Sequence, residues 1–440
     1  MSNELKVVVG LDIGTTKICA IVGKTNEHGK VEVLAMGKSE SLGVIRGEVR
    51  NIERTKTAII DAIEKAKVSL LKNNPNMRIE INSVHVGIAG QHIKSLQHQN
   101  SISRTNSDIE ISQEDVDRLT KDTYNLALPP GDAIIHVLPQ EYTVDDIGDV
   151  IDPVGMSGIR LSSNFNIITG NVDAIRNITR SVERADLKIA DLILEPLSSA
   201  EAVLSQEEMD AGVCLVDIGG GTTDVAIFKK GIIRHTAVIP FGGQIITRDI
   251  EEGCNVLNTH AELLKIKFGS ALASENKDNE VVSLPSLRGR PSKEILVKNL
   301  ALVIQARVEE IFESVLFEIK SSGLEKKLNA GIVITGGGSQ LKHLDKLVEF
   351  VTGIDTRIGY ANEHLGKTSF LDEIKSPMYA TGVGLMMKGL KSIEHSEEEL
   401  EMPKSETAEK PKNKAIGLIQ KILDKGNKYL FDSNENIQDY

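Results

Sequence analysis

The chain has 440 residues, 40% hydrophobic and 26% charged, a balance that supports a buried core in two domains or one large bilobed domain. Its formal net charge is -12 at pH 7 and only 3% of its residues are aromatic, so we exclude generic nucleic-acid binding, which needs a positive surface. Cys19, Cys214 and Cys254 form no CxxC pair and indicate free thiols in a reducing compartment.

The N-terminus opens directly into an apolar strand at 7–12, with none of the segments of a signal peptide. A Gly-Thr-Thr turn follows, and a second strand runs over 17–22. The same unit returns at 212–228: an apolar strand, Asp-Ile-Gly, a threonine-containing turn and a returning strand. A repeated unit of this kind predicts a duplicated domain, and each copy is predicted to be a β-hairpin.

Helical periodicity appears at 53–71, 172–185, 296–321 and 340–351. Helices alternating with strands predict an α/β fold with a mixed sheet in each lobe. The stretch 90–163 has strands of its own and one helix that starts near Ser112–Asp115, so we expect a small inserted subdomain.

After about residue 389 the composition changes. Residues 394–413 are rich in Glu, Lys, Ser and Pro and predict a disordered linker, and an apolar pattern returns at 414–431. No apolar run reaches the roughly 20 residues of a membrane-spanning helix, so we expect a protein that does not cross a bilayer.

The first glycine-bearing turn carries groups that suit a phosphate. Gly14 allows backbone angles that point successive N–H groups at an anion. Hydroxyl donors and a positive charge follow at Thr15, Thr16 and Lys17. Asp12, at the strand end, is placed to hold Mg²⁺ through water, because this ion gives up its hydration shell reluctantly.

The second turn offers bare backbone and hydroxyl groups at Gly219, Gly220, Gly221, Thr222 and Thr223. Asp217 mirrors Asp12 as a metal-holding carboxylate, so two facing hairpins would grip a polyphosphate from both lobes. A third loop, Gly336-Gly337-Gly338, follows an apolar strand and precedes a helical pattern, so its backbone can approach a nucleobase or phosphate at a helix N-terminus.

Any one of these loops could be a tight turn that uses glycine for geometry alone. Together they repeat one logic, and their spacing matches neither a Walker A loop nor a Rossmann fingerprint. The three loops resemble the phosphate-1, phosphate-2 and adenosine motifs of the superfamily that contains actin, sugar kinases and DnaK-type chaperones.

Two further segments extend this resemblance. Glu195-Pro196 is similar to the superfamily's connecting motif, which helps to position water near the γ-phosphate. Glu262 and Lys265 resemble the helix that contacts ribose and adenine; by themselves they would be an ordinary exposed helix pair. The resemblance implies an actin-like ATPase fold of two ribonuclease-H-like lobes that bind ATP and Mg²⁺. Its catalytic residues would be Asp12, Glu195 and Asp217.

The strings HVLPQEY at 136–142 and DPVGMSG at 152–158 resemble the inserted subdomain of the FtsA family, as do GVIRGEV at 43–49 and SPMYATGVGL at 376–385. His136 and Tyr142 are expected to be core residues of that subdomain. The resemblance divides the chain into subdomain 1A (1–83 and 376–393), inserted subdomain 1C (84–162), subdomain 2A (163–247 and 330–375), subdomain 2B (248–329), the linker (394–413), a C-terminal amphipathic helix (414–431) and a tail (432–440).

The segment 414–431 separates into two faces at 100° per residue, one aliphatic and one rich in lysine. This pattern predicts a helix that lies in a membrane interface and that anionic lipid attracts. The residues expected at the membrane are Ile416, Ile419, Ile422, Leu423 and Leu430, with Lys421 and Lys425 toward the headgroups. The alternative is a helix docked on the protein itself or on a partner.

The FtsA resemblance implies an ATP-binding cell division protein that polymerises at the cytoplasmic face of the membrane, at the division site, and is at most a slow ATPase. It would anchor FtsZ, whose C-terminal peptide would bind 248–329, and recruit other divisome proteins. Gln305, Arg307 and Glu310 are candidate contacts. The alternatives are an MreB-type shape-determining filament and a small-molecule kinase of the same superfamily.

Overall fold

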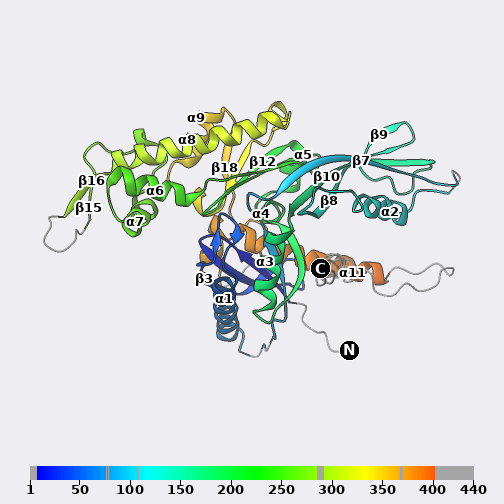
Figure 1. Ribbon diagram of the computed structural model, residues 1–440, viewed down its shortest axis with the longest axis horizontal. Coiled ribbons are helices and arrows are strands. Elements are labelled where there is room, and N and C mark those ends of the chain that lie inside the picture. Colours follow the sequence, from blue (N-terminus) through cyan, green and yellow to red (C-terminus); the bar gives the residue numbers. More distant parts are fainter. Residues whose placement is uncertain are drawn as a thin grey trace, which may run out of the picture.

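The computed structural model describes residues 7–75, 77, 79–106, 109–284, 292–366 and 370–401. They form two lobes and two smaller subdomains; in Figure 1 the subdomains lie toward opposite ends of the long axis, and the first lobe, with α1 (Ile52–Asn73) and β3 (Val31–Glu40) in blue, projects below it. The predicted amphipathic helix at 414–431 and the tail at 432–440 lie outside the described residues. Within the described part of the chain, no helix combines the length and apolar character that crossing a membrane requires.

The first lobe is built on a five-stranded sheet with the N-terminal hairpin at its centre. In spatial order the strands are β11 (Lys188–Leu194), β6 (Ser83–Ile88), β1 (Val8–Ile13), β2 (Lys17–Thr25) and β3 (Val31–Glu40). The first three strands of the chain form an antiparallel meander, whereas β6 is parallel to β1 and β11 is parallel to β6. Every residue of β1 is buried, as its unbroken apolar run predicts.

The second lobe repeats this sheet. Its strands are, in spatial order, β14 (Ile232–Ile239), β13 (Thr223–Lys229), β12 (Val213–Ile218), β17 (Ile332–Thr335) and β18 (Thr356–Ile358). Again three antiparallel strands are followed by two parallel ones. The repetition confirms the predicted duplication of an α/β lobe.

Helices cover both faces of the two sheets. The first sheet shares a core with α1 (Ile52–Asn73) and α3 (Val172–Glu183). The second shares a core with α6 (Gly243–Cys254), α7 (Asn258–Phe268), α8 (Val297–Ser321) and α9 (Leu344–Thr352). Between the sheets, α4 (Glu195–Val203) and α11 (Ala380–Glu401) belong to a core that takes residues from both lobes.

The C-terminal part of the described chain departs from its prediction. After the short helix α10 (Leu371–Ile374), α11 continues to Glu401, so residues 394–401 are helical although we predicted them to be part of a disordered linker. The physical reason is that Glu-rich sequence has good helix propensity and meets no helix breaker before Pro403. Low hydrophobicity alone therefore wrongly predicted disorder for residues 394–401.

The inserted subdomain has one sheet and one helix, as predicted. The sheet order is β7 (Lys94–Ser103), β10 (Arg160–Asn171), β8 (Asp132–Val144) and β9 (Ile147–Val150), with α2 (Gln113–Thr123) beside it. A capping box between Ser112 and Asp115 starts the helix. The subdomain has its own core, in which Phe165, Leu161 and Leu119 are fully buried.

The strand pairing moves two of the predicted boundaries. The predicted inserted segment, 84–162, starts inside β6, a strand of the first-lobe sheet, and stops inside β10. The predicted second-lobe segment, 163–247, includes β11, which pairs with β6 in the first lobe. Sequence alone could not show the pairing of β11 with β6, because parallel partners are joined by long crossovers.

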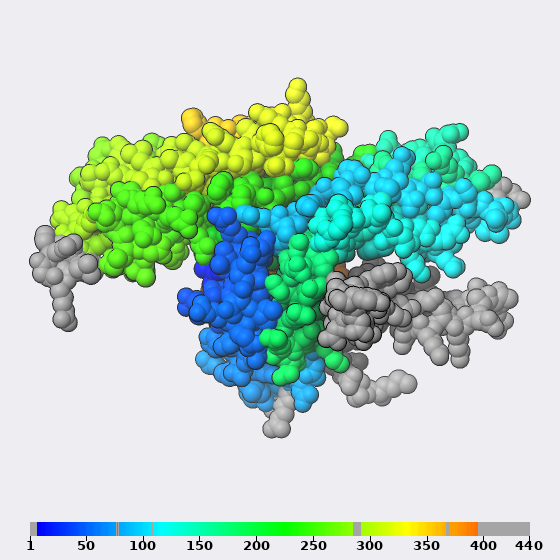
Figure 2. Space-filling view, viewed as in Figure 1, coloured from blue at the N-terminus to red at the C-terminus, as the bar shows by residue number. Residues whose placement is uncertain are grey.

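A second small subdomain projects from the other lobe. It contains α6, α7, α8 and the hairpin of β15 (Val281–Leu284) and β16 (Lys293–Leu296). In Figure 2 it forms one end of the molecule, in green to yellow, and the inserted subdomain forms the other end, in cyan. The two projections therefore extend away from the region where the lobes meet.

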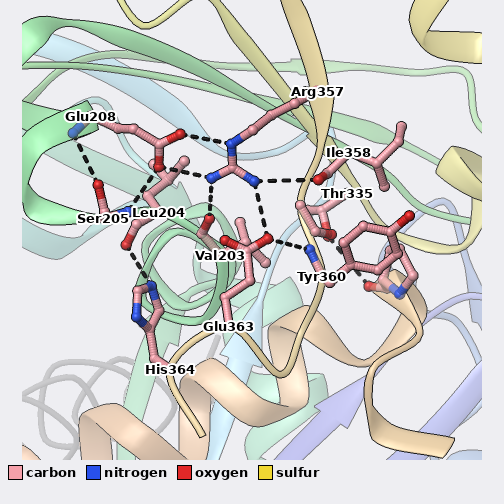
Figure 3. Close-up of polar contacts among 12 residues, drawn as sticks. Val203, Leu204, Ser205, Glu208, Thr335, Arg357, Ile358, Tyr360, Glu363 and His364 are labelled. Carbon is pink, nitrogen blue, oxygen red and sulfur yellow. Dashed lines mark hydrogen bonds and ion pairs between the residues drawn. The ribbon is translucent and has the colours of Figure 1, made fainter. Parts of the chain in front are cut away.

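A polar cluster around Arg357 fastens β18 to the chain that leaves α4 (Figure 3). The guanidinium binds both carboxylate oxygens of Glu208, on α5 (Gln206–Ala211), at 2.7 and 2.8 Å and the Val203 carbonyl at 2.8 Å. It also reaches Glu363 at 3.0 Å. His364 binds the Leu204 carbonyl at 2.8 Å. The edge strand of the second lobe is thus tied to the helix between the sheets.

Candidate nucleotide site

The two predicted hairpins have the same turn. In the first, the Gly14 N–H donates to the Lys17 carbonyl at 3.0 Å, and in the second the Gly219 N–H donates to the Thr222 carbonyl at 2.9 Å. Each turn closes a tightly paired antiparallel hairpin that is buried along its strands. The duplication predicted from sequence is therefore present at the level of single hydrogen bonds.

The two turns lie against each other. A Cβ added to Gly220 would be 1.9 Å from the Thr16 hydroxyl, and one added to Gly221 would be 2.8 Å from the Thr15 hydroxyl. Only glycine lets the backbone of the second turn come this close to the first. The structure thus brings both turns together into one surface of N–H groups and hydroxyls, the kind of surface that binds an anion.

Carboxylates gather behind the turns with one cation among them. Lys17 is bonded to Asp12 at 2.6 Å. Burial opposes the charge of Lys17, but Asp12 together with Cys19 and Tyr379 outweighs burial, and the pKa of Lys17 is raised. Asp217 accepts hydrogen bonds from Ser199 at 2.6 Å and Thr381 at 3.3 Å. Burial raises the pKa of Asp217, and the negative charge of Asp12 adds to that rise.

Two more buried carboxyl groups, those of Asp224 and Glu195, lie near Asp12 and Asp217. Burial and the nearby Asp217 raise the pKa of Asp224 to about 8. Glu195, at the start of α4, packs on Gly87, where an added Cβ would be 2.9 Å from its Cγ. Burial, and then the charges of Asp12, Asp224 and Asp217, raise the pKa of Glu195 well above its usual value. A cation brought in by a ligand would relieve this concentration of negative charge.

Mg²⁺ fits this donor set as an ion held mainly by water and phosphate. Asp12 and Asp217 are the residues that would hold such an ion, since Mg²⁺ commonly binds through one or two carboxylates while keeping several waters. Among the residues that the structure describes, no group of three or more His, Cys, Asp or Glu side chains could hold a metal by itself.

The third glycine loop packs on the second hairpin. Gly336 has a φ of +83°, and an added Cβ would be 2.2 Å from the Asp217 Oδ1 atom. A Cβ on Gly338 would be 2.3 Å from Ile218. The expected helix does not leave this loop directly: Gly337–Gln340 is a 3₁₀ turn, and α9 begins only at Leu344. The periodic pattern at 340–351 had merged these two elements.

Glu262 and Lys265 lie behind the second turn. The N–H groups of Gly243 and Gln244, at the start of α6, donate to the carbonyls of Gly219 and Gly220, each at 2.8 Å. Lys265, on α7, donates to the Gly243 carbonyl at 2.8 Å and to Glu262 at 2.8 Å. Both predicted residues are thus linked to the second glycine turn through α6.

Sequence reasoning missed several residues of the site. Ser199 and Thr381 hold Asp217, but Ser199 lies in no motif, and the string at 376–385 that contains Thr381 indicated only the family. Burial lowers the pKa of His136 to about 4, with the charge of Lys388 contributing, and its Nε2 atom accepts the Leu194 N–H at 3.0 Å, next to Glu195. His136 therefore lies at the boundary with β11, whereas Tyr142 belongs to the subdomain core as expected.

The candidate partner-binding side chains on α8 are already engaged inside their subdomain. Gln305 accepts the Ala273 N–H at 2.9 Å, and Arg307 binds Asp249 through two nitrogens and also Glu310. Arg307 also lies over the ring of Phe241. These contacts give Gln305 and Arg307 structural roles in the subdomain, and Glu310 is the exposed member of the three.

The class of protein is defined by two repeated lobes whose glycine turns face each other: the chain has the actin-like ATPase fold. The fold agrees with solved structures of low sequence identity. A chain of the PilM–PilN type IV pilus biogenesis complex matches with a TM-score of 0.60 at 15% identity, covering 87% of this chain and 98% of that one. MreB5 of Spiroplasma citri bound to ADP matches with a TM-score of 0.52 at 14% identity, covering 89% and 98%.

Sequence comparison narrows the class to one family. The family model "Cell division protein FtsA" matches residues 214–384, and "SHS2 domain inserted in FTSA" matches 90–169. Cell division protein FtsA of Pseudomonas aeruginosa is 40% identical over 88% of this chain and 89% of the relative. FtsA of Escherichia coli K12 is 35% identical over 91% and 94%. The chain belongs to the FtsA family of cell division proteins.

Proposed function

We propose that the chain binds ATP with Mg²⁺ between its two hairpins and that this ligand controls self-assembly into actin-like protofilaments. The observation that carries the proposal is the direct contact of the two glycine turns, with Asp12 and Asp217 behind them. MreB5 of Spiroplasma citri, which shares the fold, was solved bound to ADP. Bound Mg²⁺ would neutralise phosphate charge, and Glu195 would orient a water.

Asp217→Ala tests the nucleotide site. We expect the variant to lose nucleotide-dependent assembly, because it removes the carboxylate of the second lobe, while its circular dichroism spectrum stays that of the wild type. The matched control is Asp146→Ala in an exposed turn of the inserted subdomain. Isothermal titration of the metal-replete protein with ATP measures the effect. An unchanged ATP affinity in Asp217→Ala, or no uptake by the wild type, contradicts the proposal.

The proposed localisation is the cytoplasmic face of the cell membrane at the division site, where the chain would be a peripheral membrane protein. Support comes from membership of the FtsA family and from the two-faced sequence at 414–431. Ile419→Glu with Leu423→Glu should release the protein from anionic liposomes in a sedimentation assay. The control, Lys414→Gln, keeps the apolar face and should still sediment. Binding retained by the double variant would indicate a docking helix.

The proposed partners are FtsZ, other divisome proteins and further copies of the chain. We place the FtsZ C-terminal peptide on residues 248–329, the projecting subdomain of the second lobe. A pull-down with that peptide tests this: Glu310→Ala should weaken capture, whereas Glu114→Ala on the exposed face of α2 should not. No capture by the wild type would contradict the proposed link to FtsZ.

A further inference from the structure

A short hairpin turn lies beside both glycine turns and has no role so far. It joins β4 (Val44–Ile45) to β5 (Glu48–Val49), and its two residues, Arg46 and Gly47, have φ values of +51° and +76°. Two left-handed residues in a row are the mark of a tight hairpin turn. A left-handed arginine is uncommon, and such backbone positions persist where surrounding contacts hold them and cluster at functional sites.

The contacts that hold this turn come from the proposed nucleotide site. The Gly47 N–H donates to the Thr15 hydroxyl at 2.9 Å. On the other side, a Cβ added to Gly221 would be 2.8 Å from the Cα atom of Arg46. The turn therefore touches the glycine turns of both lobes at once, and Arg46 is anchored where they meet.

The charges of this region single out Arg46. Two other described cations lie near the glycine turns, and each forms an ion pair. Lys17 is paired with Asp12, and Lys265 is paired with Glu262. Arg46 is exposed, and no hydrogen bond or ion pair of its side chain occurs within the described residues. It is thus a cation at the junction of the lobes that is still available to an incoming anion.

We propose that Arg46 binds the terminal phosphate of a bound nucleoside triphosphate and so distinguishes it from the diphosphate. This inference rests on the proposed nucleotide function. A guanidinium suits the task because its planar fork binds phosphate through two parallel hydrogen bonds. The turn is braced by both lobes, so the arginine contacts the phosphate only while the two glycine turns stay together.

The same turn also contacts the base of the inserted subdomain. A Cβ on Gly47 would be 2.9 Å from the Cα of Gly90, where the chain leaves the first lobe. Glu48 lies 3.5 Å from Nδ1 of His92, and a Cβ on Gly170, where the chain returns, would be 3.3 Å from the His92 ring. These contacts connect the turn to the inserted subdomain, and this relay would pass the occupancy of Arg46 on to it.

The first experiment measures ATP and ADP binding, each with Mg²⁺, by isothermal titration of the full chain. Arg46→Gln should weaken ATP binding by about tenfold or more, the loss expected for charge-assisted hydrogen bonds, and change ADP binding less than about twofold. Arg54→Gln is the control, because it removes the same charge from an exposed position on α1. Both nucleotides should bind it as they bind the wild type.

The other possible results of the titration separate a failure of the proposed function from a failure of the role of Arg46. If the wild type binds neither nucleotide, the proposed function fails. If the wild type binds both and Arg46→Gln weakens both equally or neither, only the role of Arg46 is overturned. Deuterium exchange then tests the relay: residues 90–93 and 165–171 should exchange more slowly with ATP than with ADP in the wild type. That difference should vanish in Arg46→Gln, and its persistence would overturn the relay.

Discussion

The two hairpins share one backbone geometry but differ in how their buried carboxyl groups are compensated. The strand register and the matching turn hydrogen bonds align Asp12 with Asp217, Lys17 with Thr222 and Cys19 with Asp224. In the first hairpin the buried carboxylate is therefore neutralised within its own turn. In the second hairpin the equivalent position is a threonine, and a second carboxyl group, Asp224, lies directly across the strand pair.

The two copies have thus kept their backbone geometry while their charged residues diverged. Asp12 has an ion pair at 2.6 Å, whereas Asp217 is held only by hydroxyl groups and Asp224 leaves its Oδ1 atom without a hydrogen-bond partner in the described structure. Buried carboxyl groups without a cation favour protonation. The second hairpin is thus the one that gains most from a cation arriving with the ligand.

The largest effect is expected from breaking the ion pair of the first hairpin. Lys17→Met leaves Asp12 buried without a partner and should lower the free energy of unfolding by about 2–4 kcal/mol. Lys24→Met on the same strand is the control: its side chain is similarly exposed, 24% against 21%, but its ion pair is 4.0 Å long. That variant should cost less than about 1 kcal/mol. Equal losses in a urea titration would refute the contrast.

The next effect tests the contact between the two hairpins. In Gly221→Ala the new methyl group would meet the Thr15 hydroxyl of the first hairpin and the Cα atom of Arg46, each at 2.8 Å, and overpacking of this kind costs about 1–3 kcal/mol of unfolding free energy. At Gly148, where the nearest atom to an added Cβ is 3.9 Å away, the same substitution should cost almost nothing. Thermal unfolding of both variants measures this, and equal melting temperatures would count against the contact.

A smaller effect isolates the second hairpin through pH. Because burial raises the pKa of Asp224 to about 8, the folded state holds a proton that the unfolded state releases near pH 4. Stability from this group is therefore present below pH 4 and is lost as pH rises toward and through 8. The free energy of unfolding of Asp224→Asn should exceed that of the wild type by about 1–2 kcal/mol at pH 9 and by less at pH 6.

Urea titrations at both pH values measure this difference, with Asp146→Asn at an exposed turn as the control. The comparison between variant and wild type removes the contribution of other titrating groups, such as Glu195. A difference that shrinks as pH rises would show that Asp224 is charged and compensated in the folded protein.

The smallest effect concerns what the hairpins share. An added Cβ on Gly14 would be 3.1 Å from the Lys17 carbonyl, and one on Gly219 would be 3.1 Å from the Thr222 carbonyl. Gly14→Ala and Gly219→Ala should therefore each cost about 1 kcal/mol or less, and agree within about 0.5 kcal/mol. A clear inequality in matched urea titrations would mean that the two turns respond differently despite their common geometry.

Much of this protein followed from local sequence. The hairpins around Asp12 and Asp217 were predictable because unbroken apolar runs and glycine turns act over a few residues. The helices at 53–71 and 296–321 were predictable from the helical periodicity of their apolar residues, and the capping box at Ser112 predicted the start of α2. The strings at 136–142 and 152–158 indicated the family because they are longer and more specific than any glycine loop.

The contacts between these hairpins, strands and loops became visible only in the tertiary structure. The pairing of β11 with β6, the hydroxyls of Ser199 and Thr381 on Asp217, and the position of Arg46 between the two glycine turns all join residues far apart in the chain. No local pattern encodes such neighbours, because the hydrophobic effect that brings the lobes together is non-directional. Sequence determined the pieces of the site, and packing determined which pieces meet.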